Sequence, residues 1–356
     1  MIGAWDSGAH RRIFVPHRHG YVLRSPTGRH RAEAGVVTGG AGFIGSHVVA
    51  RLNDQGHQVR VVDDLSTGRA EYVPSGVELL RESVVDADAL AAAVEGVDTV
   101  IHLAAIASVA RSVEAPRETH EVNLAATIAL QQAMVARGVR RIVYASSAAV
   151  YGAVERDAHH EDDAASPLTP YAIDKLAGEQ YGRFFAATHG LDVRALRFFN
   201  VYGPRQLPSS PYAGVISQFA ERLLRDEPIT IYGDGHQTRD FIYVDDVAAI
   251  VVRHALEDAA PTEPFIMNVC NGGETSLHEL VEVLASLTGR EPRVRFEAER
   301  SGDIRHSRGV PQRLEAWFPD RPRTSLRDGL EDVVAWMGAA SASGCAATFG
   351  PTSDVG

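Results

Sequence analysis

The stretch Thr38-Gly39-Gly40-Ala41-Gly42-Phe43-Ile44-Gly45 decides the fold of this chain. A short apolar run precedes the stretch and helical periodicity follows it, which predicts a turn from a strand into a helix. Gly39, Gly42 and Gly45 let the backbone approach a pyrophosphate with no Cβ in the way, and the helix N-terminus favours the phosphate charge. The stretch therefore predicts a dinucleotide-binding turn at the start of a βαβ unit.

Asp63 supports this prediction from the end of the next apolar run, residues 59–62. It follows Gly39 by 24 residues, a spacing at which an acidic side chain accepts the ribose hydroxyls of a dinucleotide. A carboxylate there repels the 2′-phosphate of NADP, and the next residue is Asp64 rather than an arginine. We therefore expect the cofactor to be NAD.

Apolar runs that suit buried strands alternate with helical patterns as far as residue 200. The expected strands are 35–38, 59–62, 99–103, 141–145 and 193–198, and the expected helices are 44–55, 118–137 and 171–188. Such alternation is typical of parallel βαβ units with right-handed crossovers. The predicted fold class is α/β, a Rossmann-type doubly wound parallel sheet with a smaller mixed α/β C-terminal substrate region.

The chain divides into four parts. Residues 1–34 are expected to be a disordered extension and 35–200 the NAD-binding Rossmann domain, to which elements near 235–260 return. Residues 201–337 are expected to form mainly the substrate-binding region, with short strands at 229–232 and 265–269. Residues 338–356 are rich in glycine, alanine and serine, which predicts a flexible tail.

Composition narrows the classes of function. Of 356 residues, 45% are hydrophobic and 23% charged, which indicates an ordinary globular protein. The formal net charge of −11 gives nucleic-acid binding no electrostatic support, and no apolar run is long enough to cross a membrane. The two cysteines, Cys270 and Cys345, have neither metal-like spacing nor the number that a disulfide framework needs. We expect a cytoplasmic protein without a metal site.

One basic residue differs from all the others, because Lys175 is the single lysine among 35 lysine and arginine residues. It follows Tyr171 by four residues, so both side chains share one face of a helix. An ammonium nearby, together with the positive ring of NAD⁺, stabilises phenolate and lowers a tyrosine pKa from about 10 toward neutrality. Ser147 follows a predicted strand, where α/β sheets bind ligands, and its hydroxyl can relay a proton. These three residues are the candidate catalytic groups.

Together these features resemble the extended short-chain dehydrogenase/reductases, and within them the NAD-dependent nucleotide-sugar 4-epimerases, over residues 35–337. Besides the glycine turn and Tyr171-Ala172-Ile173-Asp174-Lys175, five stretches carry the resemblance. They are Asp63-Asp64-Leu65-Ser66-Thr67-Gly68, His102-Leu103-Ala104-Ala105, Ser146-Ser147-Ala148-Ala149-Val150-Tyr151-Gly152, the run from Arg197 to Arg205, and the run from Gly233 to Phe241. Arg300-Ser301-Gly302-Asp303 follows near the end.

The resemblance implies a ligand for each matched position. Cofactor contacts are implied for Gly39, Gly42, Phe43, Ile44, Gly45, Asp63, Asp64, Leu65, Ser66, Thr67, Gly68, Ser83, Val84, Leu103, Ala104, Ala105, Ala107, Asn123, Tyr171, Lys175 and Phe199. UDP-sugar contacts are implied for Ser147, Ala148, Tyr171, Asn200, Val215, Tyr232, Arg239, Arg300, Asp303 and Ser307. The two arginines suit a diphosphate, because a guanidinium binds phosphate oxygens with paired donors.

The activity that the resemblance implies is NAD-dependent epimerisation of a UDP-sugar at C4. Tyr171, assisted by Ser147, is expected to take the proton of the 4-hydroxyl while hydride passes from C4 to NAD⁺. The transient 4-keto sugar then turns in the pocket, and hydride returns to its opposite face. The implied substrates are UDP-Glc and UDP-Gal, UDP-GlcNAc and UDP-GalNAc, or both pairs.

Other functions stay open at this stage. The alternatives are a nucleotide-sugar dehydratase, a decarboxylase or a uronic-acid 4-epimerase. In this superfamily, dehydratases and decarboxylases carry an acidic residue just after the serine or threonine, whereas Ala148 and Ala149 follow Ser147 here. A net oxidoreductase would release NADH. A non-enzymatic NAD-binding protein would need the glycine turn but not the three catalytic candidates.

The resemblance also bears on the choice of sugar. In the resembled epimerases the position of Ser307 borders the sugar C2, where a tyrosine excludes an N-acetyl group and a small residue admits it, so N-acetylated sugars are expected to fit. Gly309 and Val310 replace the usual Ala-Asp, and Leu207 replaces a common aspartate, which leaves the identity of the sugar open. The family is commonly dimeric, so a homodimer is expected.

Overall fold

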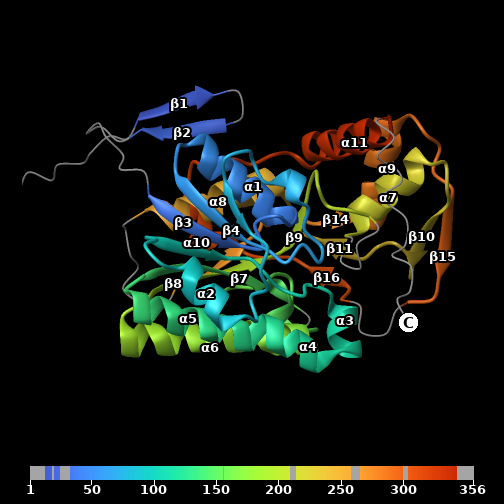
Figure 1. Cartoon of the computed structure of the whole chain (residues 1–356). Helices are drawn as coiled ribbons and strands as arrows, with labels where there is room; N and C mark the ends of the chain where they lie inside the picture. Colours follow the sequence, from blue (N-terminus) through green and yellow to red (C-terminus); the bar gives the residue numbers. More distant parts are fainter. Residues whose placement is uncertain are drawn as a thin grey trace, which may run out of the picture.

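A seven-stranded parallel sheet forms the centre of the molecule in the computed structural model, which describes residues 13–17, 20–24, 33–154, 156–208, 214–257, 265–299 and 304–342 (Figure 1). The strand order is β13-β8-β7-β6-β3-β4-β5. The strands are β3 (Ala34–Thr38), β4 (Gln58–Val62), β5 (Glu78–Leu80), β6 (Thr99–His102), β7 (Arg141–Ser147), β8 (Asp192–Phe198) and β13 (Phe265–Val269). This order is that of a doubly wound dinucleotide-binding sheet extended by one strand, and it confirms the predicted fold class.

Two layers of helices cover the sheet, because consecutive strand residues point to opposite faces. Val37 and Ile101 pack against α1 (Phe43–Asp54) and α8 (Val244–Leu256). Val36 and Val100, their chain neighbours, pack toward α2 (Ala87–Ala93), α5 (Ala126–Arg137) and α6 (Pro170–His189). All four side chains are at most 1% exposed. Figure 1 shows α1 and α8 above the sheet, with α5 and α6 below it.

Smaller sheets and three helices build the second part of the molecule. β10 (Ile229–Tyr232) pairs with β15 (Val294–Glu297), β9 (Asn200–Tyr202) with β12 (Phe241–Tyr243), and β11 (Thr238–Arg239) lies between β14 (Thr275–Ser276) and β16 (His306–Ser307). An apolar core joins β9, β10, β12 and β15 to α7 (Val215–Leu224), α9 (Leu277–Thr288) and α11 (Leu326–Ala342), and these three helices lie together on one side in Figure 1. α8, α10 (Gln312–Trp317) and β13 also come late in the chain, yet they complete the central sheet and its helical layer.

The structure divides the helix expected at 118–137. Here α4 (Pro116–His120), which follows α3 (Val109–Glu114), leads into a π-helical turn, η2 (Glu121–Ala125), before α5 begins. Asn123 lies in this turn, and its side-chain amide binds the backbone of Ile106. Periodicity alone does not reveal such a turn, because one extra residue barely changes the apolar pattern. Two 3₁₀ turns, η1 (Ala70–Tyr72) and η3 (Ala148–Tyr151), lie in the connections after β4 and β7.

The two ends of the chain are only partly described. Within residues 1–34, for which the sequence predicted disorder, β1 (Ile13–His17) and β2 (Gly20–Arg24) form an antiparallel hairpin. The other residues up to 32 lie outside the described ranges. α11 continues past residue 337, where the predicted tail began, and the tail beyond residue 342 is likewise outside them.

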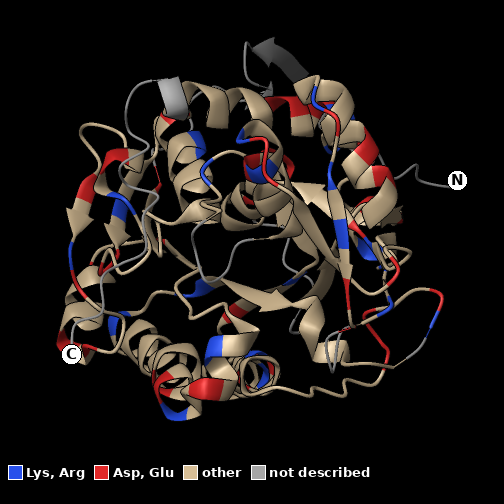
Figure 2. Cartoon of the chain, turned by 90° about the vertical axis from the view of Figure 1, so that its right-hand side faces the viewer, with Lys and Arg blue, Asp and Glu red and all other residues tan. Residues whose placement is uncertain are grey.

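The charged residues at the surface are of mixed sign. Figure 2 shows acidic and basic residues interspersed on the outer helices and loops rather than gathered by sign. None of the helices in the described ranges has an apolar stretch long enough to cross a membrane.

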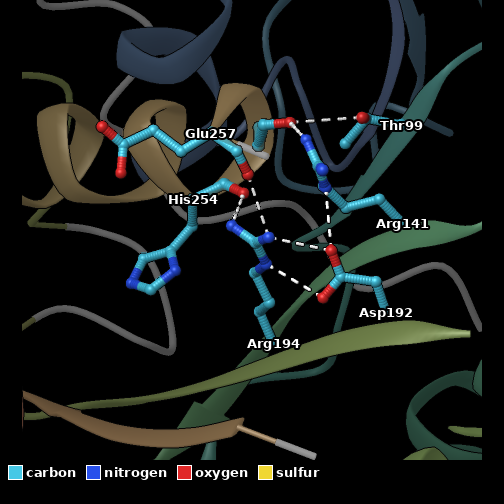
Figure 3. A network of polar contacts seen from close by, with 7 residues as sticks. Thr99, Arg141, Asp192, Arg194, His254 and Glu257 are labelled. Carbon is cyan, nitrogen blue, oxygen red and sulfur yellow. Dashed lines mark hydrogen bonds and ion pairs between the residues drawn. The ribbon is translucent and has the colours of Figure 1, made fainter. Parts of the chain in front are cut away.

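Two arginines from neighbouring strands bind the last carbonyl groups of α8 (Figure 3). Arg194 donates to the carbonyl oxygens of His254 at 2.7 Å and Glu257 at 3.0 Å, and Arg141 donates to that of Ala255 at 2.9 Å. The carboxylate of Asp192 binds both guanidinium groups. The last carbonyls of a helix lack partners within it, so these cations satisfy them and complement the helix dipole. This network fixes α8 at the amino-terminal edge of the sheet.

We expect Arg194→Met to lower the free energy of unfolding by about 3 kcal/mol, because Arg194 is 1% exposed and its loss removes a buried cation from Asp192 and from two carbonyls at the end of α8. Urea denaturation measures the change. Arg137→Met is the control, since its pair with Glu95 lies at the surface and should shift stability by about 0.5 kcal/mol or less. Equal effects of the two substitutions would contradict a capping role for Arg194.

Candidate active site

The glycine turn lies at the carboxyl end of β3, against the loop that follows β6. Gly39 has a φ of +70°, and a Cβ there would lie 2.8 Å from the backbone nitrogen of Ala104. A Cβ on Gly45 would collide with the carbonyl oxygen of Gly39. α1 begins at Phe43, and its N-cap residue Gly42 supplies no side-chain acceptor to the first turn. The turn is therefore tight and lacks side chains where the sequence predicted a pyrophosphate.

The Asp63 carboxylate ties this turn to the loop after β4. One oxygen accepts the Ala41 N–H and the other the Leu65 N–H, both at 2.9 Å. Gly68 packs against this carboxylate, since a Cβ there would lie 2.7 Å from Asp63 Oδ1. Burial raises the pKa of Asp63, although the two backbone hydrogen bonds oppose this effect. Asp64 is exposed and accepts the Ser66 N–H at 2.9 Å, while Thr67 lies between these residues and Gly68.

A buried histidine that the sequence analysis did not single out holds the loop after β6. His102 Nδ1 lies 2.7 Å from the Thr38 hydroxyl, and Nε2 lies 2.9 Å from that of Thr127. Thr127 donates its own hydrogen to the carbonyl of Asn123 at 2.7 Å, which places the imidazole proton on Nε2. Burial, with the charge of Lys175 adding to it, lowers the pKa of His102 to about 3. A neutral imidazole thus joins β3 and β6 to the first turn of α5.

Asn123 acts on the same loop. Its side-chain oxygen accepts the Ile106 N–H at 2.8 Å, and its amide nitrogen donates to the Ile106 carbonyl at 3.0 Å. Both ends of the amide therefore hold backbone, and they shape the segment with Leu103, Ala104, Ala105 and Ala107 that the sequence placed along the cofactor. Ser83 and Val84 follow β5 at the neighbouring end of the sheet, and Val84 is 6% exposed.

Ser147, Tyr171 and Lys175 come together between β7 and α6. Thr169 caps α6 by accepting the Ala172 N–H at 3.3 Å, and Pro170 occupies the first helical position, so Tyr171 lies in the first turn. The Tyr171 hydroxyl forms a hydrogen bond with Ser147, the last residue of β7. Ala148 follows it as the first residue of η3.

The Lys175 ammonium lies near two aromatic rings, one turn along α6 from Tyr171. It donates to the carbonyl of Ala145 at 2.8 Å and lies 5.9 Å from the centre of the Tyr171 ring. The centre of the Tyr144 ring lies 5.2 Å from it. Gly178 makes room for this ring, because a Cβ there would collide with the Tyr144 hydroxyl. The packing of β7 against α6 thus fixes where the ammonium lies.

The electrostatics of this group differ in part from expectation. Burial raises the pKa of Tyr171 above its ordinary value, and the hydrogen bond with Ser147 lowers it only partly. Burial also lowers the pKa of Lys175 to about 8. In the protein alone, Lys175 therefore does not bring the phenol toward neutrality.

A second set of predicted residues gathers around Asp240, which the sequence analysis did not single out. Its buried carboxylate accepts the N–H groups of Asn271, Gly272 and Gly309, and burial raises its pKa to about 6. The Asp240 carbonyl accepts a hydrogen bond from the Asn200 side chain, and the Asp240 N–H donates to the carbonyl of Ser307. Arg239 lies directly opposite Ser307 in the pairing of β11 with β16.

The remaining predicted residues lie around these two groups. Val215 begins α7 and Tyr232 ends β10, while Arg300 and Asp303 lie outside the described residues. Phe199 is 6% exposed, and a Cβ on Gly309 would lie 2.6 Å from its ring. The alanine usual in the resembled family would not fit here without a shift of the ring. No group of three or more His, Cys, Asp and Glu side chains in the described ranges is arranged to hold a metal ion.

Comparisons with known proteins agree with this geometry. The model of the NAD dependent epimerase/dehydratase family matches residues 36–270. A UDP-glucose 4-epimerase of Mycolicibacterium smegmatis is 40% identical over 309 residues, which cover 85% of this chain and 97% of that protein.

Solved structures of similar proteins share the fold over almost their whole length. The UDP-N-acetylglucosamine 4-epimerase from Methanobrevibacter ruminantium, in complex with UDP-N-acetylmuramic acid, is 35% identical with a TM-score of 0.82 and covers 87% of this chain and 99% of its own. The UDP-glucose 4-epimerase of Thermus thermophilus, in complex with NAD, is 37% identical with a TM-score of 0.80 and covers 86% and 99%. The resemblance seen in the sequence is confirmed, and this chain belongs to the NAD-dependent epimerase/dehydratase family.

Proposed function

We propose that this protein is an NAD-dependent UDP-sugar 4-epimerase. The observation that carries the proposal is the hydrogen-bonded pair of Ser147 and Tyr171, with the Lys175 ammonium beside it, two strands from the glycine turn in one parallel sheet. The carboxyl ends of parallel strands meet at one edge, so the proton-transferring hydroxyls and the dinucleotide turn face a common space. The 4-epimerases among the similar proteins support the same reaction.

The residues present fit NAD. The turn has no side chains at Gly39 and Gly45, where a Cβ would strike backbone, and Asp63, predicted from the sequence to bind the ribose, lies beside this turn. When bound, NAD accepts hydride from the sugar C4 and returns it, which no side chain can do. The protein's part is to hold the sugar and to move the proton of the 4-hydroxyl.

Ser147 and Tyr171 perform the proton transfer in this proposal. The raised pKa of the Tyr171 phenol means that it needs a positive charge beside it before it can act as a base near neutral pH. Lys175 supplies a fixed charge near the ring, and an oxidised nicotinamide carries another. Because Ala148 and Ala149 follow Ser147, no carboxylate at that strand end moves a proton at C5, which favours return of the hydride over dehydration.

Arg239, together with Arg300 from the sequence prediction, is proposed to hold the UDP diphosphate, and Asn200 and Asp303 to contact other parts of the UDP-sugar. Ser307 lies next to Arg239 across two strands, so it can border the sugar once the diphosphate is bound. Its small side chain leaves room for an N-acetyl group, and we propose that UDP-GlcNAc and UDP-GalNAc are substrates beside UDP-Glc and UDP-Gal.

We propose that the protein works in the cytoplasm as a homodimer without nucleic-acid or membrane partners. Cys270 is a buried free thiol, which suits a reducing compartment. Ile173 and Phe184 are 51% and 50% exposed and share the outer face of α6, with Val113 of the neighbouring α3 61% exposed. Exposed apolar side chains that share one face are typical of an interface between subunits.

Tyr171→Phe should lower turnover of UDP-galactose by about 100-fold or more while NAD stays bound, because only the proton-transferring oxygen is lost. NMR of the sugar products measures turnover, and the absorbance of released cofactor measures NAD. Tyr181→Phe, a substitution at an exposed position of the same helix, should change neither. Near-normal turnover in Tyr171→Phe would end the proposal.

Ser307→Tyr should lower conversion of UDP-GlcNAc by about tenfold or more relative to UDP-glucose, because the ring fills the space beside C2. Both substrates are tested with each protein, so UDP-glucose is the internal control. The specificity proposal fails if the unaltered protein converts UDP-GlcNAc far more slowly than UDP-glucose and the substitution leaves the ratio unchanged.

Phe184→Glu should convert the dimer into a monomer with intact NAD binding, because a charge in an apolar interface has no partner. Light scattering after size-exclusion chromatography gives the mass of each species. A monomeric unaltered protein, or a dimer that tolerates the substitution, would contradict the proposed interface.

A further inference from the structure

A buried ion pair joins α6 to β8 one helical turn beyond Lys175. The Glu179 carboxylate accepts the Arg197 Nε at 2.8 Å and Nη2 at 2.7 Å, so both of its oxygens bind the guanidinium. The two side chains are 0% and 4% exposed. Burial disfavours the Arg197 cation, but the hydrogen bonds and charge of Glu179 outweigh burial and raise the pKa of Arg197 above its ordinary value. Arg197 therefore stays a cation, and Glu179 holds it at two points.

This pair contacts the catalytic strand directly. Ser146, the neighbour of Ser147, donates its hydroxyl to Glu179 at 2.5 Å. Tyr171, Lys175 and Glu179 follow one another at intervals of four residues, so they share the inner face of α6. Glu179 therefore fixes the rotation and height of that face relative to the end of β7.

On the other side, Arg197 reaches the strands that lead to the sugar-binding edge. Ser146, Arg197 and Asn268 lie in register across β7, β8 and β13. Arg197 also donates to the Glu161 carbonyl at 3.2 Å and lies 4.8 Å from the Tyr151 ring. Phe199 and Asn200, predicted to contact nicotinamide and sugar, follow Arg197 by two and three residues.

The contacts continue to the segment after Ser307. Tyr151 donates to the Asn268 side chain at 2.6 Å, and Asn268 donates to the His159 carbonyl at 2.8 Å. His159 in turn exchanges backbone hydrogen bonds with Arg308 and Val310, each at 2.9 Å. A continuous set of short contacts thus connects the inner face of α6 with the strand that holds Ser307.

Burial of two charges is costly, and an apolar pair of similar volume is often at least as stable, so stability alone does not account for such a pair. What an apolar pair lacks is direction, because only the planar guanidinium fixes both carboxylate oxygens at once. A matched pair exists at the other end of the same strand, where Arg194 binds Asp192 far from the catalytic hydroxyls.

We propose that Glu179 and Arg197 are positioning residues, which hold Ser147, Tyr171 and Lys175 in register with the sugar-binding edge of the second part of the molecule. This inference rests on the proposed epimerase function. Neither side chain touches a reacting atom, and both act through the strands and the helix that they join.

The test compares Glu179→Gln and Arg197→Lys with Asp192→Asn in the NAD-loaded protein. Glu179→Gln keeps the shape but removes the charge, and Arg197→Lys keeps the charge but removes the two-point geometry. Both should lower kcat by about 10- to 100-fold, as expected for a small misplacement of reacting groups, with KM and NAD content little changed. Asp192→Asn should lower the thermal midpoint but leave kcat unchanged.

A second readout needs no substrate. In protein labelled with ¹³C at tyrosine Cζ, the Tyr171 signal is identified by its loss in Tyr171→Phe. It should move or broaden in Glu179→Gln and Arg197→Lys but not in Asp192→Asn. If Glu179→Gln does not fold, Arg197→Lys carries both measurements.

The outcomes separate the two proposals. If the unaltered protein converts no UDP-sugar, the proposed function fails, and the Tyr171 signal still tests the positioning role. If kcat and the Tyr171 signal are unchanged in both variants, or if Asp192→Asn alters them equally, Glu179 and Arg197 have no special role at the site. A fall in kcat that only follows loss of NAD or of folded protein also overturns the proposal.

Discussion

The constraint on which this molecule depends is that parallel strands end at one edge of the sheet. The glycine turn follows β3, the His102 loop follows β6, Ser147 ends β7 and Phe199 follows β8. Each group is supplied by a different part of the sequence, yet all reach the same edge because the strands run in one direction. α6 then adds Tyr171 and Lys175 by packing along β7. Without a common strand direction, no arrangement of these residues would place the hydroxyls beside a dinucleotide.

The groups that shape this edge are mostly buried polar side chains bound to backbone. Asn123, Asp63 and Asp240 bind backbone N–H groups, His102 binds the hydroxyls of Thr38 and Thr127, and all four side chains are buried. A loop held this way has one conformation, because release of a buried donor or acceptor without a new partner is costly. The conformation of the site is therefore fixed by buried polar side chains that lie behind the residues predicted to contact the ligands.

Much of the fold could be predicted from the sequence, because buried parallel strands are short apolar runs that end at turns. The strands ending at Thr38, Val62 and Phe198 were predicted to within a residue at either end. The π-helical turn at Asn123 could not be predicted, since it changes the helical pattern by one residue. β13 was expected in the second part of the chain, because a five-residue run with four apolar side chains does not indicate which sheet it joins.

The site residues could be predicted where the chemistry requires a particular residue type. They could not be predicted where a residue acts through its burial. Tyr171, Lys175 and Ser147 stand out by type and spacing. His102 and Asp240 act through burial, which sequence spacing does not reveal, and the raised pKa of Tyr171 follows from burial as well. Both residues lie inside stretches that resemble the family, so their positions carried a signal without a stated role.

Lys175 also has a consequence for chemical labelling of the protein. It holds the sole ε-amine in the sequence, and that amine is 3% exposed and bound to the Ala145 carbonyl. Acylating reagents therefore find no lysine on the surface. The rate at which such a reagent consumes this amine measures how often α6 lifts away from β7, and a bound ligand that closes the site should slow it.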